Sequence, residues 1–567
     1  MWINPLETTL IKRIGIDRGF LVIACVVFTY LFLYTIQGYG LTWDAWEYYM
    51  GDKNFNFYGG FNSDYLDYGI DNVAIHNEPW HPDFFEVTAA YGTDIDVFKA
   101  PHLIWPFGHT SSSFTKYLFT SWLPVFDAID AHHCVLILYG IILIISLYYF
   151  VKHFAGRTEA VASIIMCFIY PRFWAHLHNN LKDIPIACFF VLIIYLIYIA
   201  VEKEKYTFFY AAAACWGVAL ATKANALFIP LILLPYIIVT LLQRRKNQIP
   251  LIPKKAIPAL LAFPFIALIT MFCAWPFLLT NFPVNIKLYI SSLFDRGYGG
   301  SATWNREPII NFLATIPLSI LFLFLTGLAL IIVQSVREKR CKPVYLILLA
   351  WFIITLLRVS IPGASDFDGI RHWLEIIPCV AIIAGIAAAT LIREVHRKIW
   401  KDPPLEKRLT ASAIIMILFL GPLLIWNYNE DPNGIAYYNP IVGYLPGAQE
   451  KNYPQSTDYW GQSYRQGMDW LLDNAEADSA LYVGVAQHIV YYTREIWLRQ
   501  DIQLRPFVGL SDQEVLQDMS KQKGAIYFMF ITRKEWYKSD FLRRVREKLK
   551  PVHVIDVDGG AILEIYR

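Results

Sequence analysis

The chain has 567 residues, of which 56% are hydrophobic and 17% are charged. One soluble core would not need so large an apolar fraction, so the composition indicates an integral membrane protein and excludes a soluble enzyme. The formal net charge is only +2. No basic stripe of the kind that binds nucleic acid is visible, so we expect no nucleic-acid partner.

Apolar runs recur along most of the chain, and each is long enough to cross a hydrocarbon layer of about 30 Å as a helix. Helices are the expected form, because lipid satisfies no backbone hydrogen bonds. The first span follows basic residues and lacks a small-residue cleavage site, so it is expected to be an uncleaved anchor. We predict about eleven spans, over residues 19–38, 132–152, 158–175, 183–201, 206–222, 224–243, 256–280, 310–334, 343–362, 371–392 and 410–427.

Basic residues gather in alternate connections between these spans, as is typical of cytoplasmic loops. The basic connections contain Lys152, Arg157, Lys203, Lys205, Arg244, Arg245, Lys246, Lys254, Lys255, Arg337, Lys339, Arg340, Lys342 and residues 393–408. This alternation predicts a multi-pass protein of the inner (plasma) membrane with a cytoplasmic N-terminus. The loop 40–130 and the chain after about residue 428 then lie together on the non-cytoplasmic side.

The predicted fold class is a polytopic α-helical membrane protein with a large first outer loop and a small C-terminal α/β domain. Residues 1–428 form the predicted transmembrane domain, and residues 429–567 form the extracytoplasmic domain. The C-terminal part alternates in hydropathy like strands in three stretches and has helical character in two. These are Ala480–Val485, Ala525–Ile531 and Val552–Ile565, with a turn at Asp558-Gly559-Gly560, and then Gln513–Lys521 and Glu535–Lys548.

Several common chemical motifs are missing from the sequence. The eight cysteines lie in or beside the predicted spans or in a cytoplasmic loop, so no disulfide framework is indicated. The metal-binding spacings CxxC and HExxH are absent, and so are the glycine patterns GxGxxG and GxxxxGK that bind nucleotide phosphates. The simplest inference is a donor or energy source other than a cytoplasmic nucleotide.

Charged residues at a membrane edge are functional candidates, because an unpaired charge there costs several kcal/mol. Asp44 and Glu47 follow the first span and share one face if the stretch is helical. One interpretation makes them catalytic. The other makes Asp44 a helix cap, with Trp43 and Trp46 in the aromatic belt of the interface.

A second polar stretch runs from His176 to Pro185 between two predicted spans. Asp183 and Pro185 suit the first turn of a helix, where a carboxylate is stabilised by about 0.3–1 kcal/mol. His178 and Asp183 on one outer loop are also candidate ligands for a divalent metal ion. Simple solvation of the loop is the alternative.

A third set is basic and lies on outer loops or beside them. The structural interpretation is that these side chains extend to the membrane interface. The functional interpretation is that they converge on a phosphate group, because guanidinium and ammonium groups are the usual partners of phosphate oxygens. The candidates for binding a donor phosphate are Lys182, Lys223, Arg296, Arg306 and Arg371.

Taken together, these stretches resemble the polyprenyl-phosphate-dependent membrane glycosyltransferases of the GT-C type, especially the protein O-mannosyltransferase and aminoarabinose transferase branch. The resemblance rests on the order and positions of five features along nearly the whole chain. They are Asp44, His178-Asn179-Asn180-Leu181-Lys182-Asp183-Ile184-Pro185, Gly217 to Lys223, Gly369-Ile370-Arg371-His372, and Asp458-Tyr459-Trp460-Gly461 with Tyr437-Tyr438-Asn439 upstream.

This resemblance implies that a sugar is transferred from a polyprenyl phosphate, at the outer face, to a hydroxyl or amine of a lipid, glycan or protein. It implies that Asp44 is the general base, that Asp183 organises the acceptor, the base or a metal, and that the basic set divides the binding of the leaving phosphate. The family places two acids side by side, whereas Glu47 follows Asp44 by three residues here. Glu47 is therefore a further catalytic candidate with an open role.

The aromatic residues of the outer loop, Trp80, Phe84, Phe85, Trp105 and Phe107, suggest short amphipathic helices that shape an acceptor pocket, or alternatively an interfacial belt. Two other functions stay open. A transporter or flippase for a lipid-linked or polar substrate also places rare charges at helix breaks, although no inverted halves are visible. A non-catalytic assembly factor would not need Asp44 or Asp183.

Overall fold

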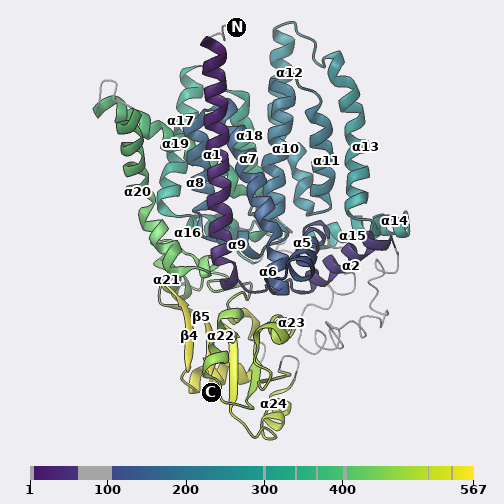
Figure 1. Ribbon diagram of the computed structural model, residues 1–567, viewed down its shortest axis with the longest axis vertical. Coiled ribbons are helices and arrows are strands. Elements are labelled where there is room, and N and C mark those ends of the chain that lie inside the picture. Colours follow the sequence, from purple (N-terminus) through teal and green to yellow (C-terminus); the bar gives the residue numbers. More distant parts are fainter. Residues whose placement is uncertain are drawn as a thin grey trace.

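The computed structural model describes residues 5–61, 105–297, 302–338, 341–364, 368–399, 405–507, 510–537 and 540–567. Long helices form a bundle, and the C-terminal part of the chain lies against one end of it (Figure 1). The bundle contains α1 (Pro5–Thr35), α7 (Val135–Phe154), α8 (Arg157–Phe168), α9 (Pro171–Asn179), α10 (Asp183–Glu202), α11 (Phe208–Leu220), α12 (Ile229–Lys246), α13 (Ile257–Ala274), α17 (Leu318–Arg337), α18 (Pro343–Ser360), α19 (Ile376–Ile399) and α20 (Leu405–Glu430).

Nine helical segments of the described residues are long and apolar enough to cross a membrane. Helices α8 and α9, bent by 71°, give a tenth if they count as one span. These spans confirm the predicted class of polytopic helical membrane protein. The predicted span 206–222 corresponds to α11, whose 13 residues extend about 20 Å. Because this is shorter than the hydrocarbon layer, an eleventh crossing stays a prediction.

Besides the span 158–175, which covers the bent pair α8 and α9, two predicted spans run across a break between helices. The span predicted over 310–334 is broken, because α16 (Glu307–Thr315) ends just before Pro317 and α17 begins after it. The span predicted over 256–280 ends early, because Pro276 follows the end of α13. The residue before a proline is disfavoured in a helix. Hydropathy alone extends both spans across these breaks.

Burial separates the inner helices from the outer ones. In the most apolar window of each helix, 83% of the residues are buried in α10 and in α19, compared with 22% in α1 and 11% in α20. Helix α19 lies close to α8 where a Cβ on Gly385 would come within 2.4 Å of Ser163 Oγ. Small residues allow such approach, and van der Waals packing is what holds helices together in lipid. The central helices therefore provide a rigid frame for the residues at their ends.

Shorter helices gather at the end of the bundle that faces the C-terminal region (Figure 1). Part of the predicted outer loop, residues 62–104 with Trp80, Phe84 and Phe85, lies outside the described residues. The described part lies at the same end as the C-terminal region, as expected if both share one compartment. Which end faces the cytoplasm stays a prediction. The short helices are α2 (Trp46–Gly60), α5 (Phe107–Tyr117), α6 (Ala128–His133), α14 (Phe277–Thr280), α15 (Val284–Gly297) and α16.

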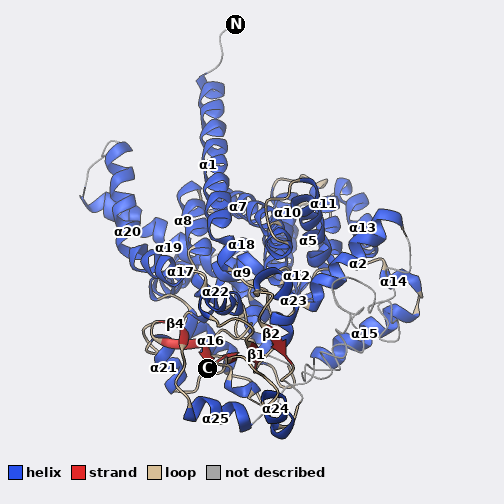
Figure 2. Ribbon diagram, turned by 60° about the horizontal axis from the view of Figure 1, so that its bottom comes forward, coloured by secondary structure: helices blue, strands red, loops and turns tan. Residues whose placement is uncertain are grey.

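Among the described residues, strands occur only in the C-terminal region, where they form one five-stranded sheet (Figure 2). The strand order is β2-β1-β3-β5-β4, with β1 parallel to β2 and β3, and β5 antiparallel to β3 and β4. The register pairs Leu481 with Leu504 and Tyr527. The strands are β1 (Ala480–Val483), β2 (Gln503–Arg505), β3 (Ile526–Ile531), β4 (His553–Val557) and β5 (Gly560–Tyr566).

The predicted strands and the turn at Asp558-Gly559 match β1, β3, β4 and β5, and the first predicted helix matches α24 (Asp512–Met519). The helix predicted over Glu535–Lys548 matches α25 (Asp540–Lys548) in its later part, whereas Lys534–Trp536 form a separate short 3-10 turn. Both residues of the Asp558-Gly559 turn have positive φ, 53° and 84°, as a tight hairpin requires. Strand β2, with three residues, was too short to predict. The other elements that the sequence did not indicate are α21 (Tyr444–Glu450), α22 (Tyr464–Asn474) and α23 (Gln487–Trp497).

The C-terminal region is bonded to the short helix α6 and to the residue before it by polar contacts. Arg465 Nη1 donates to Asp130 Oδ1 at 2.6 Å and its Nη2 donates to Asp130 Oδ2 at 3.1 Å. The indole nitrogen of Trp497 donates to Asp127 Oδ2 at 2.9 Å. A bidentate arginine and carboxylate pair fixes orientation as well as distance. The predicted domain boundary near residue 428 falls within α20 and stays a prediction.

Candidate active site

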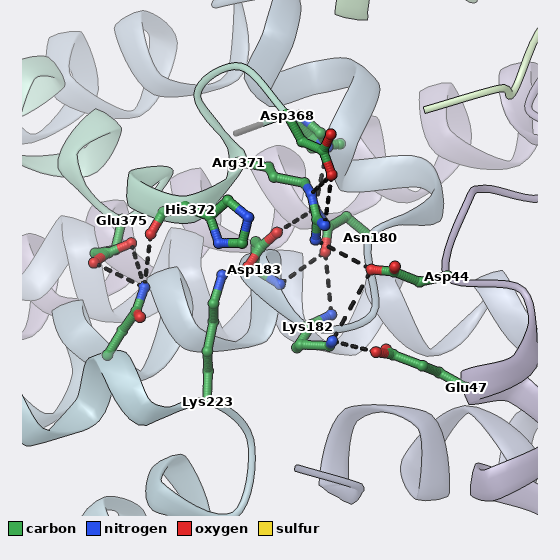
Figure 3. A network of polar contacts seen from close by, with 12 residues as sticks. Asp44, Glu47, Asn180, Lys182, Asp183, Lys223, Asp368, Arg371, His372 and Glu375 are labelled. Atoms are coloured by element: carbon green, nitrogen blue, oxygen red, sulfur yellow. Dashed lines mark hydrogen bonds and ion pairs between the residues drawn. The ribbon is translucent and has the colours of Figure 1, made fainter. Parts of the chain in front are cut away.

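Residues from four distant segments meet where the bundle contacts the C-terminal region (Figure 3). Asp44 lies in the turn between α1 and α2, and Glu47 lies in the first turn of α2. Lys182 immediately precedes α10, and Asp183 is the first residue of this helix. Lys223 follows α11, and the last segment, with Asp368 and Arg371, precedes α19. We call these seven residues the charged cluster: Asp44, Glu47, Lys182, Asp183, Lys223, Asp368 and Arg371.

Arg371 joins two carboxylates of the charged cluster. Its Nη1 donates to Asp44 Oδ2 at 3.1 Å, and its Nη2 donates to Asp368 Oδ2 at 2.7 Å. The guanidinium also lies over the Trp460 ring, 5.2 Å from its centroid. Burial alone would lower the pKa of Arg371, but Asp44 and Asp368 hold it above its usual range. Arg371 is therefore permanently charged, and these contacts fix the orientation of its guanidinium plane.

Lys182 joins Asp44 to Glu47 on the other side. Its ammonium group forms an ion pair with Glu47 Oε1 and lies 4.0 Å from Asp44 Oδ2. Glu47 is also 2.6 Å from His109 Nε2. Asp44 thus has cations on two sides, yet it accepts only one direct hydrogen bond from them, from Arg371.

The two carboxylates near Lys182 differ in proton affinity. Burial raises the pKa of Asp44 above its ordinary value, and the negative charge of Glu47 adds to this effect, while Arg371 and Lys182 oppose it. Burial also acts to raise the pKa of Glu47, but Lys182 and His109 lower it to about 2. When environments separate the pKa values of two acids, the acid with the higher pKa is the better proton acceptor. Asp44 is therefore the better candidate for a general base.

Asp183 is the most enclosed carboxylate of the charged cluster, with a side chain that is 0% exposed. One oxygen forms an ion pair with Lys223, and the other accepts a hydrogen bond from Asn180 Nδ2 at 2.8 Å. The backbone N–H of Asp183 in turn donates to Asn180 Oδ1 at 2.8 Å. Asp183 thus lies in the first turn of α10, as the sequence predicted, and Asn180 Oδ1 accepts a hydrogen bond from the backbone where this helix begins. Asp183 itself fixes Lys223 inside the protein.

The sequence placed other candidates near this site, and the structure puts one of them, Arg306, elsewhere. Arg306 is exposed at the start of α16 and has no ion pair with the described charged cluster. Arg296 falls in α15, and its side chain lies outside what the structure describes. Trp105, expected in an acceptor pocket, donates to Tyr289 Oη at 3.0 Å. The phosphate-binding roles of Arg296 and Arg306 stay predictions.

The surroundings of His178 give no support to its interpretation as a metal ligand beside Asp183. The His178 ring stacks between Phe32 and Tyr39, with centroids 4.5 and 4.1 Å away. Its Nδ1 donates to the Trp174 carbonyl at 2.9 Å, and its Nε2 contacts Thr35 Oγ1 at 2.9 Å. Both ring nitrogens thus have hydrogen-bond partners other than Asp183, and the metal-binding role stays a prediction.

No group of three or more His, Cys, Asp and Glu side chains within the described ranges is arranged to hold a metal ion.

Sequence reasoning missed several residues around the charged cluster. His109 and Arg533 gave no signal, because each is an isolated polar residue outside any motif. Glu375 gave a weak signal as a charge in an apolar stretch. It is buried against Arg358, with Oε1 2.5 Å from Nη2, and Asn225 donates to it at 3.2 Å.

The fold and the charged cluster define a polytopic helical membrane protein with a candidate active site at one end of its bundle. Residues 123–275 match the family model described as Dolichyl-phosphate-mannose-protein mannosyltransferase. This match confirms the predicted resemblance: the chain is similar to glycosyltransferases of the GT-C type that use lipid-phosphate-linked donors. No curated protein matches the sequence.

Several solved structures are similar over most of this chain. ArnT from Cupriavidus metallidurans, bound to undecaprenyl phosphate, is 13% identical with a TM-score of 0.48, covering 97% of each chain. AglB from Archaeoglobus fulgidus, in complex with an inhibitory peptide and a dolichol-phosphate, is 11% identical with a TM-score of 0.43, over 86% of this chain and 66% of that one. The arabinofuranosyltransferase AftD from Mycobacteria is 13% identical with a TM-score of 0.42, over 97% and 40%.

Proposed function

We propose that the protein transfers a sugar from a polyprenyl phosphate to a hydroxyl or amine group of an acceptor, at the non-cytoplasmic face of the membrane. The observation that carries the proposal is the position of Asp44. Its side chain is 17% exposed, whereas those of Glu47, Asp183 and Asp368 are 3%, 0% and 6% exposed. Asp44 is thus the carboxylate of the charged cluster that an acceptor can reach, and it lies beside two cations.

In the proposed reaction, Asp44 takes the proton from the acceptor oxygen or nitrogen as that atom attacks the anomeric carbon of the sugar. A new bond forms from the acceptor atom to this carbon. The bond from the carbon to the phosphate oxygen breaks, and its electron pair leaves with the polyprenyl phosphate. A single displacement of this kind inverts the anomeric centre.

The cations of the charged cluster suit the leaving phosphate. Arg371 has a planar set of donors, and Lys182 and Lys223 provide ammonium groups. A phosphate beside Asp44 adds negative charge, which raises the pKa of this carboxylate further and increases its affinity for the acceptor proton. Asp183 holds Lys223 in place, and Glu47 holds Lys182. We therefore assign the proton transfer to Asp44 and positioning roles to Asp183 and Glu47.

The family match over residues 123–275 supports a lipid-phosphate sugar as the donor class. The same site is compatible with a mannose, another hexose or a pentose, and with a lipid, glycan or protein acceptor. The cytoplasmic N-terminus inferred from the basic loops puts the charged cluster on the opposite side of the membrane. A donor consumed there needs no nucleotide at the site, in agreement with the missing nucleotide motifs.

The test compares glycans, glycolipids and glycoproteins from cells that lack the protein with cells that produce the wild type or Asp44→Asn. We expect one modification to be missing without the protein and to return with the wild type only. The missing modification names the sugar and the acceptor. If no glycan changes, or if Asp44→Asn restores the modification fully, the proposed function is wrong. A change in the distribution of an unmodified lipid-linked sugar would instead favour a flippase.

A further inference from the structure

The loop before α19 is held by side chains from the C-terminal region. The backbone N–H of Gly369 donates to Gln455 Oε1, and Arg533 Nη2 donates to Asp368 Oδ1 at 2.7 Å. Gly369 has a φ of +63°, and a Cβ there would lie 2.8 Å from the Tyr459 ring. Only glycine suits this close approach and this backbone conformation. The C-terminal region therefore fixes the loop that carries Asp368 and Arg371.

Arg533 is a charged side chain of the C-terminal region that contacts the charged cluster directly, through its ion pair with Asp368. It is only 6% exposed. Besides Asp368, its Nη1 donates to the Tyr459 carbonyl at 2.6 Å. Its guanidinium lies 4.9 Å from the Trp43 ring and 5.6 Å from the Trp536 ring. A continuous series of ion pairs runs from Arg533 through Asp368 and Arg371 to Asp44.

The segment before Asp44 is attached to the same region. The backbone N–H of Trp43 donates to the Trp460 carbonyl at 2.7 Å, and His488 Nε2 donates to the Trp43 carbonyl at 2.9 Å. The Trp43 ring packs against Trp536, with centroids 5.0 Å apart. Both partners of the ion pair between Asp44 and Arg371 are therefore positioned by residues from beyond residue 430.

We propose that Arg533 is a positioning residue, through which the C-terminal region holds Asp368 and, with it, the phosphate-binding guanidinium of Arg371. This inference rests on the proposed function, because it assigns Arg371 to the lipid phosphate. Because Arg533 occupies Asp368 Oδ1, this carboxylate cannot bind Arg371 through both of its oxygens. Without Arg533, Arg371 turns toward Asp368 and away from the position it shares with Asp44.

The test measures binding of undecaprenyl phosphate to the purified full-length protein in detergent. Arg533→Gln should weaken binding about tenfold, since one fixed charge-assisted contact is disturbed indirectly. Arg533→Lys should recover part of this loss, because its ammonium still reaches one partner. The matched control is Arg546→Gln. Arg546 donates to Glu564 Oε1 at 2.9 Å within the same region and does not contact the charged cluster, so binding should be unchanged.

A double-mutant cycle distinguishes a positioning role of Arg533 from a general effect on how the C-terminal region packs against the bundle. If Arg533 acts through Asp368, adding Arg533→Gln to Asp368→Asn should weaken binding no further. Arg465→Gln removes the contact with Asp130. It should lower the thermal midpoint of unfolding and have little effect on the affinity for undecaprenyl phosphate. Wild-type affinity in Arg533→Gln, or fully additive losses with Asp368→Asn, would contradict the positioning role and leave the proposed function standing. Failure of the wild type to bind undecaprenyl phosphate would overturn both.

Discussion

Asp17 lies in the N-terminal half of α1, Asp44 follows the C-terminal end of this helix, and the surroundings of the two acids differ. Asp17, in α1, accepts hydrogen bonds from Tyr148 at 2.7 Å and from Arg157 at 2.6 and 3.1 Å, and it also pairs with Lys152. Asp44 accepts one bond, from Arg371 at 3.1 Å. Its side chain is more exposed, 17% against 7%.

The comparison shows how two carboxylates beside cations can have different roles. A carboxylate whose oxygens are saturated by donors gains stability from them and has little capacity to accept a proton from a substrate. A carboxylate with one donor and access to solvent keeps that capacity. We therefore interpret Asp17 as structural and Asp44 as the proposed base.

The largest expected effect is on turnover in Asp44→Asn. Asparagine keeps the size of the side chain and its contact with Arg371 but cannot take a proton. We expect kcat to fall about 100- to 10,000-fold, the usual range for general-base assistance, with undecaprenyl phosphate still bound and the thermal midpoint retained. Steady-state transfer by purified protein measures this. A rate near that of the wild type would move the role of base to another acid, with Glu47 the next candidate.

Arg371→Ala should weaken binding of undecaprenyl phosphate by about ten- to a hundredfold, because it removes a charge-assisted contact to phosphate. The comparison is Arg306→Ala, at an exposed arginine outside the charged cluster whose predicted phosphate-binding role is tested at the same time. Equilibrium binding in detergent measures both. If the two variants lose affinity equally, the phosphate site is not confined to the charged cluster.

Glu47→Gln should change the pH dependence of transfer. The base is active only when deprotonated, so activity falls as the pH drops through the pKa of Asp44. Burial and the charge of Glu47 both raise that pKa. The substitution removes the charge of Glu47 and frees Lys182 to approach Asp44, and both changes lower the pKa of Asp44. The acidic limb of the activity profile should therefore move to lower pH. A pH profile of kcat measures this shift. An unmoved limb, or one that moves to higher pH, argues against Asp44 as the titrating group.

The smallest effect on activity is expected for Asp17→Asn. It removes acceptors from Arg157 and Lys152, whose side chains are 37% and 27% exposed and can be hydrated. We expect the free energy of unfolding to fall by about 1–3 kcal/mol, with kcat per folded molecule unchanged. Thermal unfolding in detergent and transfer assays measure the two quantities. A large loss of kcat without a loss of stability would remove the contrast with Asp44.

Much of the site could be predicted because its residues break a strong pattern. Asp44, Asp183, Lys223 and Arg371 are charges at the ends of apolar runs, where a charge is costly unless it is paired or hydrated. Which of these charges pair with one another could not be derived from the sequence, because it depends on where the ends of α2, α10, α11 and α19 lie relative to one another. Spacing alone also left His178 open as a partner of Asp183 at a metal site. The end of α9 instead places its ring between Phe32 and Tyr39.

The fold shows the same division between what hydropathy predicts and what it does not. Apolar runs indicated the long helices, and alternation indicated four of the five strands. The break before Pro317 and the short strand β2 depend on local backbone chemistry and on pairing across the sheet. Arg533 is one charge among many in a polar segment. Its position between Asp368 and Trp43 arises only when the C-terminal region packs against the bundle.

The most direct test compares Asp44→Asn with Asp17→Asn in one single-turnover assay, with donor bound beforehand and rates normalised to folded protein. The chemical step is then observed apart from binding and stability. The account predicts that Asp17→Asn transfers at the wild-type rate, while Asp44→Asn retains bound donor and loses transfer by about 100-fold or more. Equal rates in the two variants would contradict the assignment of Asp44 as the general base.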